Sequence, residues 1–196
     1  MSARSGMSNL ITELRGMTEA GTADYTVTSS TYWSDNHLQD ALDAHRTDLI
    51  FQPLQIYPTV TTGGSSLYQD YRAPLGMLEE TTGGTAIFYI QDSTGATIGS
   101  ANYTPDYRRG QIQFTASQGG TVYYLTARSY DLNAAAADVW RKKAAHVAPT
   151  SFDFSTDNHS INRSKVYTHC LEMADFFEGK SNNSVTSVPM WRSDVC

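Results

Sequence analysis

The chain has 196 residues, enough for one domain of ordinary size with at most a small second one. Its 11% of aromatic residues and 17% of charged residues exclude an intrinsically disordered protein, and no apolar run approaches the ~20 residues of a membrane span. The net charge of −6 argues against a protein whose main role is to bind the phosphate backbone of a nucleic acid. The N-terminal residues lack the apolar segment of a secretory signal, so we expect a soluble, folded, intracellular chain.

Two helical patterns occupy residues 1–48. The first predicts a helix over residues 9–17 with Ser8 at its N-cap, because the apolar residues recur on one face. The second predicts a helix that begins after Ser34 as N-cap and ends near Asp48.

Residues 49–128 change to short strand patterns separated by Gly, Pro and Asp-rich turns. Threonine and tyrosine, which favour a half-exposed pleated surface, are frequent throughout this part. Leu54 and Ile56 alternate with polar neighbours, and the nearby Pro53 and Pro58 indicate an edge strand or bends. The spacing of the turns predicts a small antiparallel sheet or barrel, with further strands expected over residues 67–71, 86–91, 96–101, 110–114 and 121–127.

The helical period returns after Tyr130. Asp131 is expected to cap a helix that runs through Val147, and residues 151–160 are expected to form a loop. A last helix is predicted over residues 163–178, followed by a tail without periodic pattern over residues 180–196.

The fold class that follows is α+β. We expect the N-terminal helices (1–48) and the C-terminal helices (129–179) to form one helical bundle body, with an inserted antiparallel β-sheet or small barrel module (49–128) and an extended C-terminal tail (180–196). The predicted helical core consists of Leu38, Leu42, Leu132, Val139, Trp140, Val166, Cys170, Met173 and Phe177.

The sequence contains none of the motifs of common enzyme families: no nucleophile elbow, phosphate-binding loop, dinucleotide fingerprint or zinc-protease motif. Asp153, Ser155 and Asp157 alternate like the first ligands of a calcium loop. However, Asn158 and Ser164 stand where an EF-hand needs Gly and Glu, so an Asx-turn is expected instead. We therefore expect no enzyme, no catalytic residue, no metal and no cofactor.

Two segments are candidate partner-binding sites. The tail carries the apolar residues Val188, Pro189, Met190 and Trp191 in an otherwise polar segment, and the candidate docking segment ends at Arg192. This pattern suits an anchor that orders on a partner, or one that packs back on its own domain. The basic residues Arg141, Lys142 and Lys143 could line a DNA channel or an interface, or form an ordinary solvated helix face.

An ordered set of short motifs extends over residues 105–174. It comprises Gly110-Gln111-Ile112-Gln113-Phe114, then Tyr130-Asp131-Leu132, an alanine-rich helix ending near Trp140, Phe152-Asp153-Phe154-Ser155, and Arg163-Ser164 with Tyr167. In this order the motifs resemble the head-tail connector proteins of tailed bacteriophages, also called portal adaptor or head-completion proteins. The helix containing Leu38 and Leu42 is similar as well.

The resemblance implies a structural virion protein. It implies a homo-oligomeric ring, commonly dodecameric, that lies under the portal protein, extends the DNA channel and offers a docking platform for tail, stopper or other neck proteins. DNA would pass without sequence-specific binding, no membrane would be involved, and residues 188–192 would dock on the portal. The location would be the neck of the virion, and the host cytoplasm during assembly. The alternative is a β-rich binding module of a phage particle that recognises carbohydrate or another virion protein.

Overall fold

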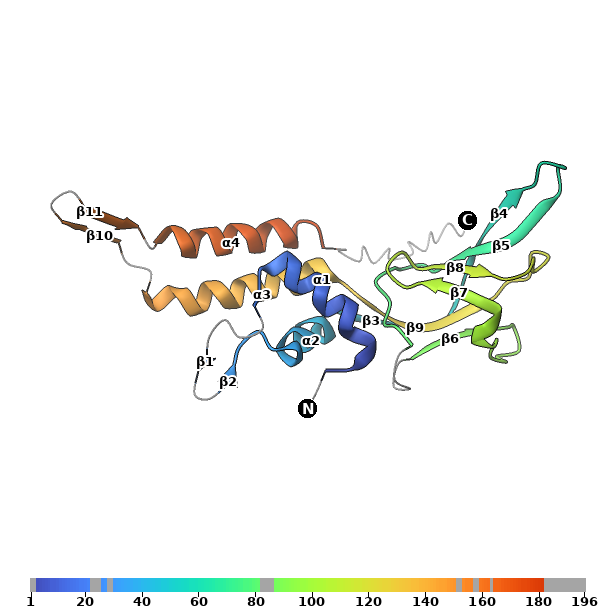
Figure 1. Ribbon diagram of the computed structural model, residues 1–196, viewed down its shortest axis with the longest axis horizontal. Helices are drawn as coiled ribbons and strands as arrows, with labels where there is room; N and C mark the ends of the chain where they lie inside the picture. Colours follow the sequence, from blue (N-terminus) through green and yellow to red (C-terminus); the bar gives the residue numbers. More distant parts are fainter. Residues whose placement is uncertain are drawn as a thin grey trace, which may run out of the picture.

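The computed structural model describes residues 3–21, 26–27, 30–81, 87–150, 153–156, 159–162 and 164–181, with side chains for 3–21, 32–81, 87–149 and 164–181. The described residues form an α+β fold with antiparallel sheets, as expected. The molecule is elongated, with the long helices toward one end and the larger sheets toward the other (Figure 1).

The helices share one hydrophobic cluster. They are α1 (Ser8–Thr18), preceded by a single 3-10 turn (Ser5–Met7), α2 (Asp35–Ala44), α3 (Leu132–Val147) and α4 (Ser164–Glu178). The helices α3 and α4 lie side by side, and α1 and α2 both contact α3 (Figure 1). The cluster includes the buried side chains of Leu14, Leu38, Leu42, Leu132, Val139, Trp140, Cys170 and Phe177.

A second hydrophobic cluster lies between two antiparallel sheets. The first sheet has the order β3 (Arg46–Pro53), β9 (Tyr124–Tyr130), β6 (Phe88–Gln91). The second has the order β4 (Gln55–Val60), β5 (Ser66–Arg72), β8 (Gln111–Phe114), β7 (Tyr103–Asp106). Because side chains alternate between the faces of a strand, each sheet buries one set of apolar residues, among them Leu49, Tyr71, Ile90, Ile112, Phe114 and Leu125.

Two short junctions connect the helices to the sheets. His45 separates α2 from β3, and Asp131 separates β9 from α3. These junctions lie side by side, and the amide of Asp131 donates a 3.1 Å hydrogen bond to the carbonyl of His45. As expected, Asp131 caps α3, and its carboxylate accepts hydrogen bonds from the amides of Asn133 and Ala134.

Two small hairpins extend from the helices. In the first, β1 (Thr26–Val27) pairs with β2 (Ser30–Thr31), and in the second, β10 (Asp153–Thr156) pairs with β11 (His159–Asn162). The second hairpin lies at the end of the molecule farthest from the larger sheets (Figure 1). The loop expected over residues 151–160 is therefore wrong. Its residues suit a strand, since Phe and Thr favour pleated structure, but its polar composition obscured that preference. Asp157 lies outside the described residues.

Several expected boundaries differ from those observed. Ser8 is the first residue of α1 instead of its N-cap, since the 3-10 turn precedes it. The helix α2 ends at Ala44, earlier than Asp48, because β3 begins at Arg46. No strand covers residues 96–101, which form an isolated bridge at Thr97 and a 3-10 turn. The strand β7, which contains a proline, was not expected.

Two residues of the predicted helical core are less buried than expected. Val166 is 50% exposed, and Met173 packs only at the edge of the cluster. The buried stripe of α4 consists instead of Cys170, Ala174 and Phe177. Val166 lies one turn before this stripe, in the first turn of α4, which the buried cluster does not include.

Candidate binding surfaces

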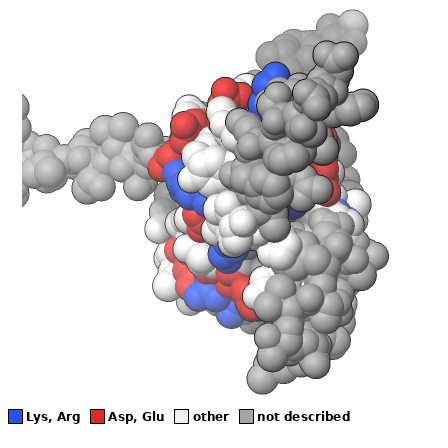
Figure 2. Space-filling view, turned by 90° about the vertical axis from the view of Figure 1, so that its left-hand side faces the viewer, with Lys and Arg blue, Asp and Glu red and all other residues white. Residues whose placement is uncertain are grey.

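The predicted basic cluster on α3 is largely held within the fold. Arg141 pairs with Asp138 at 3.4 Å and with Glu178. The ammonium of Lys143 donates hydrogen bonds to carbonyl oxygens at the end of α1 and lies 5.0 Å from the centre of the Trp140 ring. Figure 2 views the molecule from the end where the helices lie, and on the described part of that surface basic and acidic residues are intermixed. This part of the surface offers no continuous basic track for a phosphate backbone.

A groove lies between the end of α3 and the beginning of α4. Its volume is about 320 Å³, and it is lined by Glu19, Trp33, Trp140, Lys143, His146, Val147, Val166, His169 and Cys170. Trp140 is buried and donates a hydrogen bond from its indole nitrogen to the carbonyl of Met17, at 3.3 Å. Burial also raises the pKa of the Cys170 thiol. We call this surface the distal groove.

An apolar patch lies on the outer face of the three-stranded sheet, at an irregular point of β3. Phe51 has a φ of 49°, in the left-handed region that a bulky residue rarely adopts. Its ring stacks on Tyr124 with centroids 4.1 Å apart, and its amide donates to the Thr126 hydroxyl at 3.1 Å. Ile50 beside it is 70% exposed, and Tyr89 on β6 is 43% exposed. We call Ile50, Phe51, Tyr89 and Tyr124 the bulge patch.

The junction between helices and sheets contains a buried carboxylate. Glu79 has an exposed fraction of 0% and accepts a 2.8 Å hydrogen bond from the Tyr130 hydroxyl. Arg4 donates to Glu79 at 3.1 Å and also binds both carboxylate oxygens of Asp43, at 2.9 and 2.6 Å. Arg128 lies 3.5 Å from the second oxygen of Glu79. The network therefore connects the N-terminal segment, α2 and β9.

Sequence reasoning missed this network. The adjacent Glu79 and Glu80 indicate nothing more than two acidic residues, and their partners are distant in sequence. The one local signal is that Glu79 directly follows the apolar residues Met77 and Leu78. A carboxylate that is buried together with such neighbours requires hydrogen-bond or ion-pair partners.

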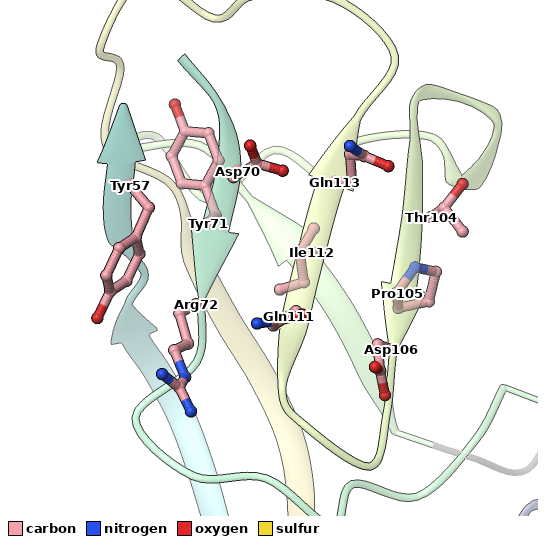
Figure 3. A pocket seen from close by; sticks show the side chains of 10 residues that line it. All are labelled: Tyr57, Asp70, Tyr71, Arg72, Thr104, Pro105, Asp106, Gln111, Ile112 and Gln113. Atoms are coloured by element: carbon pink, nitrogen blue, oxygen red, sulfur yellow. The ribbon is translucent and has the colours of Figure 1, made fainter. Parts of the chain in front are cut away.

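A hollow of about 390 Å³ lies on the four-stranded sheet, lined by residues of all four strands (Figure 3). Its lining residues are Tyr57, Asp70, Tyr71, Arg72, Thr104, Pro105, Asp106, Gln111, Ile112 and Gln113. Tyr71 and Ile112 belong to the buried cluster on the inner face. The residues that alternate with them are polar and lie on the outer face.

The strand register arranges these polar residues in two rows across the sheet. One row is Tyr57, Asp70, Gln113 and Thr104, and the other is Arg72, Gln111 and Asp106. Each neighbour within a row is a paired residue on the next strand, which places its Cβ atom about 5 Å away. The hollow is therefore a direct product of the pairing and needs no loop to form it.

Most polar groups of the hollow have no partner among the side chains that the structure describes. Asp106 is an exception, because its carboxylate accepts a hydrogen bond from the amide of Arg109, at 3.1 Å, and lies 3.9 Å from the Arg109 guanidinium. Within residues 32–81 and 87–149, the side chains of Asp70, Arg72, Gln111 and Gln113 have neither a hydrogen bond nor an ion pair. The hollow thus presents donors and acceptors that a bound molecule could satisfy.

Other site types are not represented in the described part of the chain. Its His, Cys, Asp and Glu side chains form no group of three or more that could hold a metal ion. None of its helices is long and apolar enough to cross a membrane. The predicted anchor, residues 188–192, lies outside the described residues.

No protein-family model and no curated protein sequence matches this chain.

Proposed function

We propose that the chain is a structural adaptor of a tailed phage, which forms a ring under the portal and extends the DNA channel. The observation that carries this proposal is the exposure of two different apolar surfaces, the bulge patch on the sheet and the distal groove on the helices. A ring built from head-to-tail contacts needs two unlike surfaces on each subunit, one to meet the other on the next copy.

The strain at Phe51 favours an interface at the bulge patch. A non-glycine residue in the left-handed region costs roughly 1–2 kcal/mol. The strained backbone at Phe51 also leaves apolar side chains in contact with solvent, since Phe51 is 39% exposed and Ile50 is 70% exposed. Two neighbouring apolar side chains held toward solvent by a strained backbone suit a surface that a second copy covers.

The motifs that resemble connector proteins have structural positions that suit this role. Tyr130 binds the buried Glu79, Asp131 caps α3, and Leu132 is buried in the helical cluster. These residues hold the junction between the sheets and the helices. In the proposed assembly, the helices form the ring body, the β module projects from it, and the tail extends toward the portal.

The charge of the chain supports a channel wall. The net charge of −6, together with the ion pairs of Arg141, makes the protein a poor ligand for DNA. DNA could then slide past the ring without being held. The ring would offer its free face to tail, stopper or other neck proteins.

Sedimentation velocity of the full chain, alone and with the portal ring of its phage, tests the assembly surfaces. We expect Ile50→Asp and Val166→Asp each to abolish ring formation, because each places a charge in one of the two apolar surfaces. Val60→Asp is the matched control, since Val60 is 72% exposed on β4 and belongs to neither surface. If both surface variants assemble like the control, the proposed contacts are wrong.

Deletion of residues 182–196 tests the portal contact separately. The shortened chain should keep its circular dichroism spectrum and lose binding to the portal ring. Unchanged portal binding would show that residues 188–192 are not the anchor.

A further inference from the structure

We propose that the hollow on the four-stranded sheet is a binding site for a neutral carbohydrate. This site goes beyond the proposed ring function and does not depend on it, because the hollow is separate from both the distal groove and the bulge patch.

The polar groups of the hollow suit a ligand rich in hydroxyl groups. Gln111 and Gln113 each offer an amide donor and a carbonyl acceptor, and Asp70 accepts while Arg72 donates in a planar fork. All four lie on one face, with neighbours about 5 Å apart across the strands and next-but-one residues roughly 7 Å apart along them. Sugar hydroxyls both donate and accept, so a regular array of mixed groups can bind several of them at once.

An aromatic side chain completes the site at its edge. Tyr57 lies on β4, opposite Asp70, and its side chain is 42% exposed (Figure 3). A hexose ring has an apolar C–H face that packs on an aromatic ring, while its hydroxyls point outward to polar groups. One exposed ring beside several polar groups can therefore contact both the apolar face and the hydroxyls of the same sugar.

The same residues disfavour other classes of ligand. A nucleic acid would bring phosphates against two carboxylates, those of Asp70 and Asp106. Asp106 already pairs with the Arg109 guanidinium at 3.9 Å, which leaves Arg72 as the one guanidinium among the lining residues. A peptide anchor needs a buried apolar pocket, whereas Tyr57 is the one large apolar side chain in the two outer-face rows. A metal ion is disfavoured because Asp70 and Asp106 stand on β5 and β7, with β8 between them. A neutral polyhydroxylated ligand remains.

The charge of the hollow also bears on the kind of carbohydrate. The carboxylates of Asp70 and Asp106 are balanced by the guanidinium of Arg72 and by that of Arg109, which lies 3.9 Å from Asp106. Because the hollow then has no net charge, it offers no net attraction to sialylated or uronic-acid glycans, and neutral hexose and N-acetylhexosamine chains suit it.

A glycan array probed with the full chain, followed by titration calorimetry with maltotetraose, cellotetraose and chitotetraose, tests the site. We expect binding to neutral oligosaccharides and a loss of affinity of about tenfold or more for Tyr57→Ala and for Gln113→Ala. Tyr167→Ala is the matched control, because Tyr167 is a tyrosine of similar exposure, 36%, on α4, outside the hollow, the distal groove and the bulge patch. Its affinity should equal that of the unchanged chain.

Several results would contradict a carbohydrate site in the hollow. Absence of binding on the array and in the titrations, or a preference for acidic glycans, would overturn the proposal. An equal loss of affinity in Tyr57→Ala and Tyr167→Ala would also overturn it. So would a loss of ring assembly in Gln113→Ala without detectable glycan binding, since the hollow would then be a protein contact.

Discussion

The hydroxyl of Tyr130 donates a 2.8 Å hydrogen bond to Glu79, whose side chain is fully buried. Tyr130 is the last residue of β9, immediately before the cap of α3, and Arg4 reaches the same carboxylate from the N-terminal segment. The contact therefore holds the sheets against the helices at the point where the chain passes between them. In the proposed ring, in which each part of the subunit carries one assembly surface, this contact would keep the two surfaces in a fixed relation.

Removal of the Tyr130 hydroxyl should destabilise the protein. A hydrogen bond to a charged group contributes about 1.5–3 kcal/mol, so Tyr130→Phe should lower the free energy of unfolding by about that amount. Urea denaturation measures it. Tyr89→Phe, at an exposed tyrosine, should change the free energy by less than about 0.5 kcal/mol. Equal midpoints for the two variants would show that the buried bond contributes nothing.

The same tyrosine should make stability depend on alkaline pH. Burial, and then the hydrogen bond to Glu79, raise the pKa of Tyr130 well above its ordinary value of about 10. Above that pH the unfolded chain binds fewer protons than the folded one, so the free energy of unfolding falls as the pH rises. One such group contributes up to about 1.4 kcal/mol per pH unit.

Urea denaturation between about pH 9 and 11 measures this slope. We expect Tyr130→Phe to flatten it without abolishing it, because burial also raises the pKa of Tyr71 and of Tyr103. Parallel slopes in the variant and the unchanged chain would contradict the assignment to Tyr130.

Gly6 and Gly16 should respond oppositely to alanine. A Cβ atom at Gly6 would collide with the carbonyl oxygen of Glu80, whose amide bonds back to Gly6 at 3.1 Å. Gly6→Ala should therefore cost about 1–3 kcal/mol. Gly16 lies exposed in α1 with open space around it, and Gly16→Ala should stabilise by about 0.5–1 kcal/mol. Thermal melting compares the two, and a stabilising Gly6→Ala would contradict the close packing of the N-terminal segment.

The N-cap residue of α3, Asp131, should contribute measurably to the free energy of unfolding. The carboxylate of Asp131 accepts two backbone hydrogen bonds of 3.0 Å, so Asp131→Ala should cost about 1 kcal/mol. Asp40→Ala, at an exposed position within α2, is the control and should have little effect. Urea midpoints that do not differ between these variants would show that the cap is dispensable.

Local patterns predicted much of this fold because their causes are local. Asp131 precedes an apolar period and caps a helix, and the alternation around Ile112 marks a strand with one buried face. The bulge at Phe51 and the exposure of Val166 could not be predicted, because they depend on which elements lie beside them. Likewise, Glu79 is buried only because Arg4 and Tyr130, far away in sequence, meet it.

The candidate sites were likewise predictable only where their cause is local in the sequence. The polar character of Gln111 and Gln113 is visible in the sequence, but their alignment with Asp70 and Arg72 requires the pairing of β8 with β5. The three basic residues of α3 looked like one cluster, whereas Arg141 and Lys143 are held by partners on other helices.

Electron microscopy of phage particles assembled in cells that produce this chain with an N-terminal tag, labelled at that tag, tests the ring proposal most directly. The account predicts label in a rotationally symmetric ring between the head and the tail, directly under the portal. Label on the head surface, on tail fibres or nowhere in the particle would contradict it.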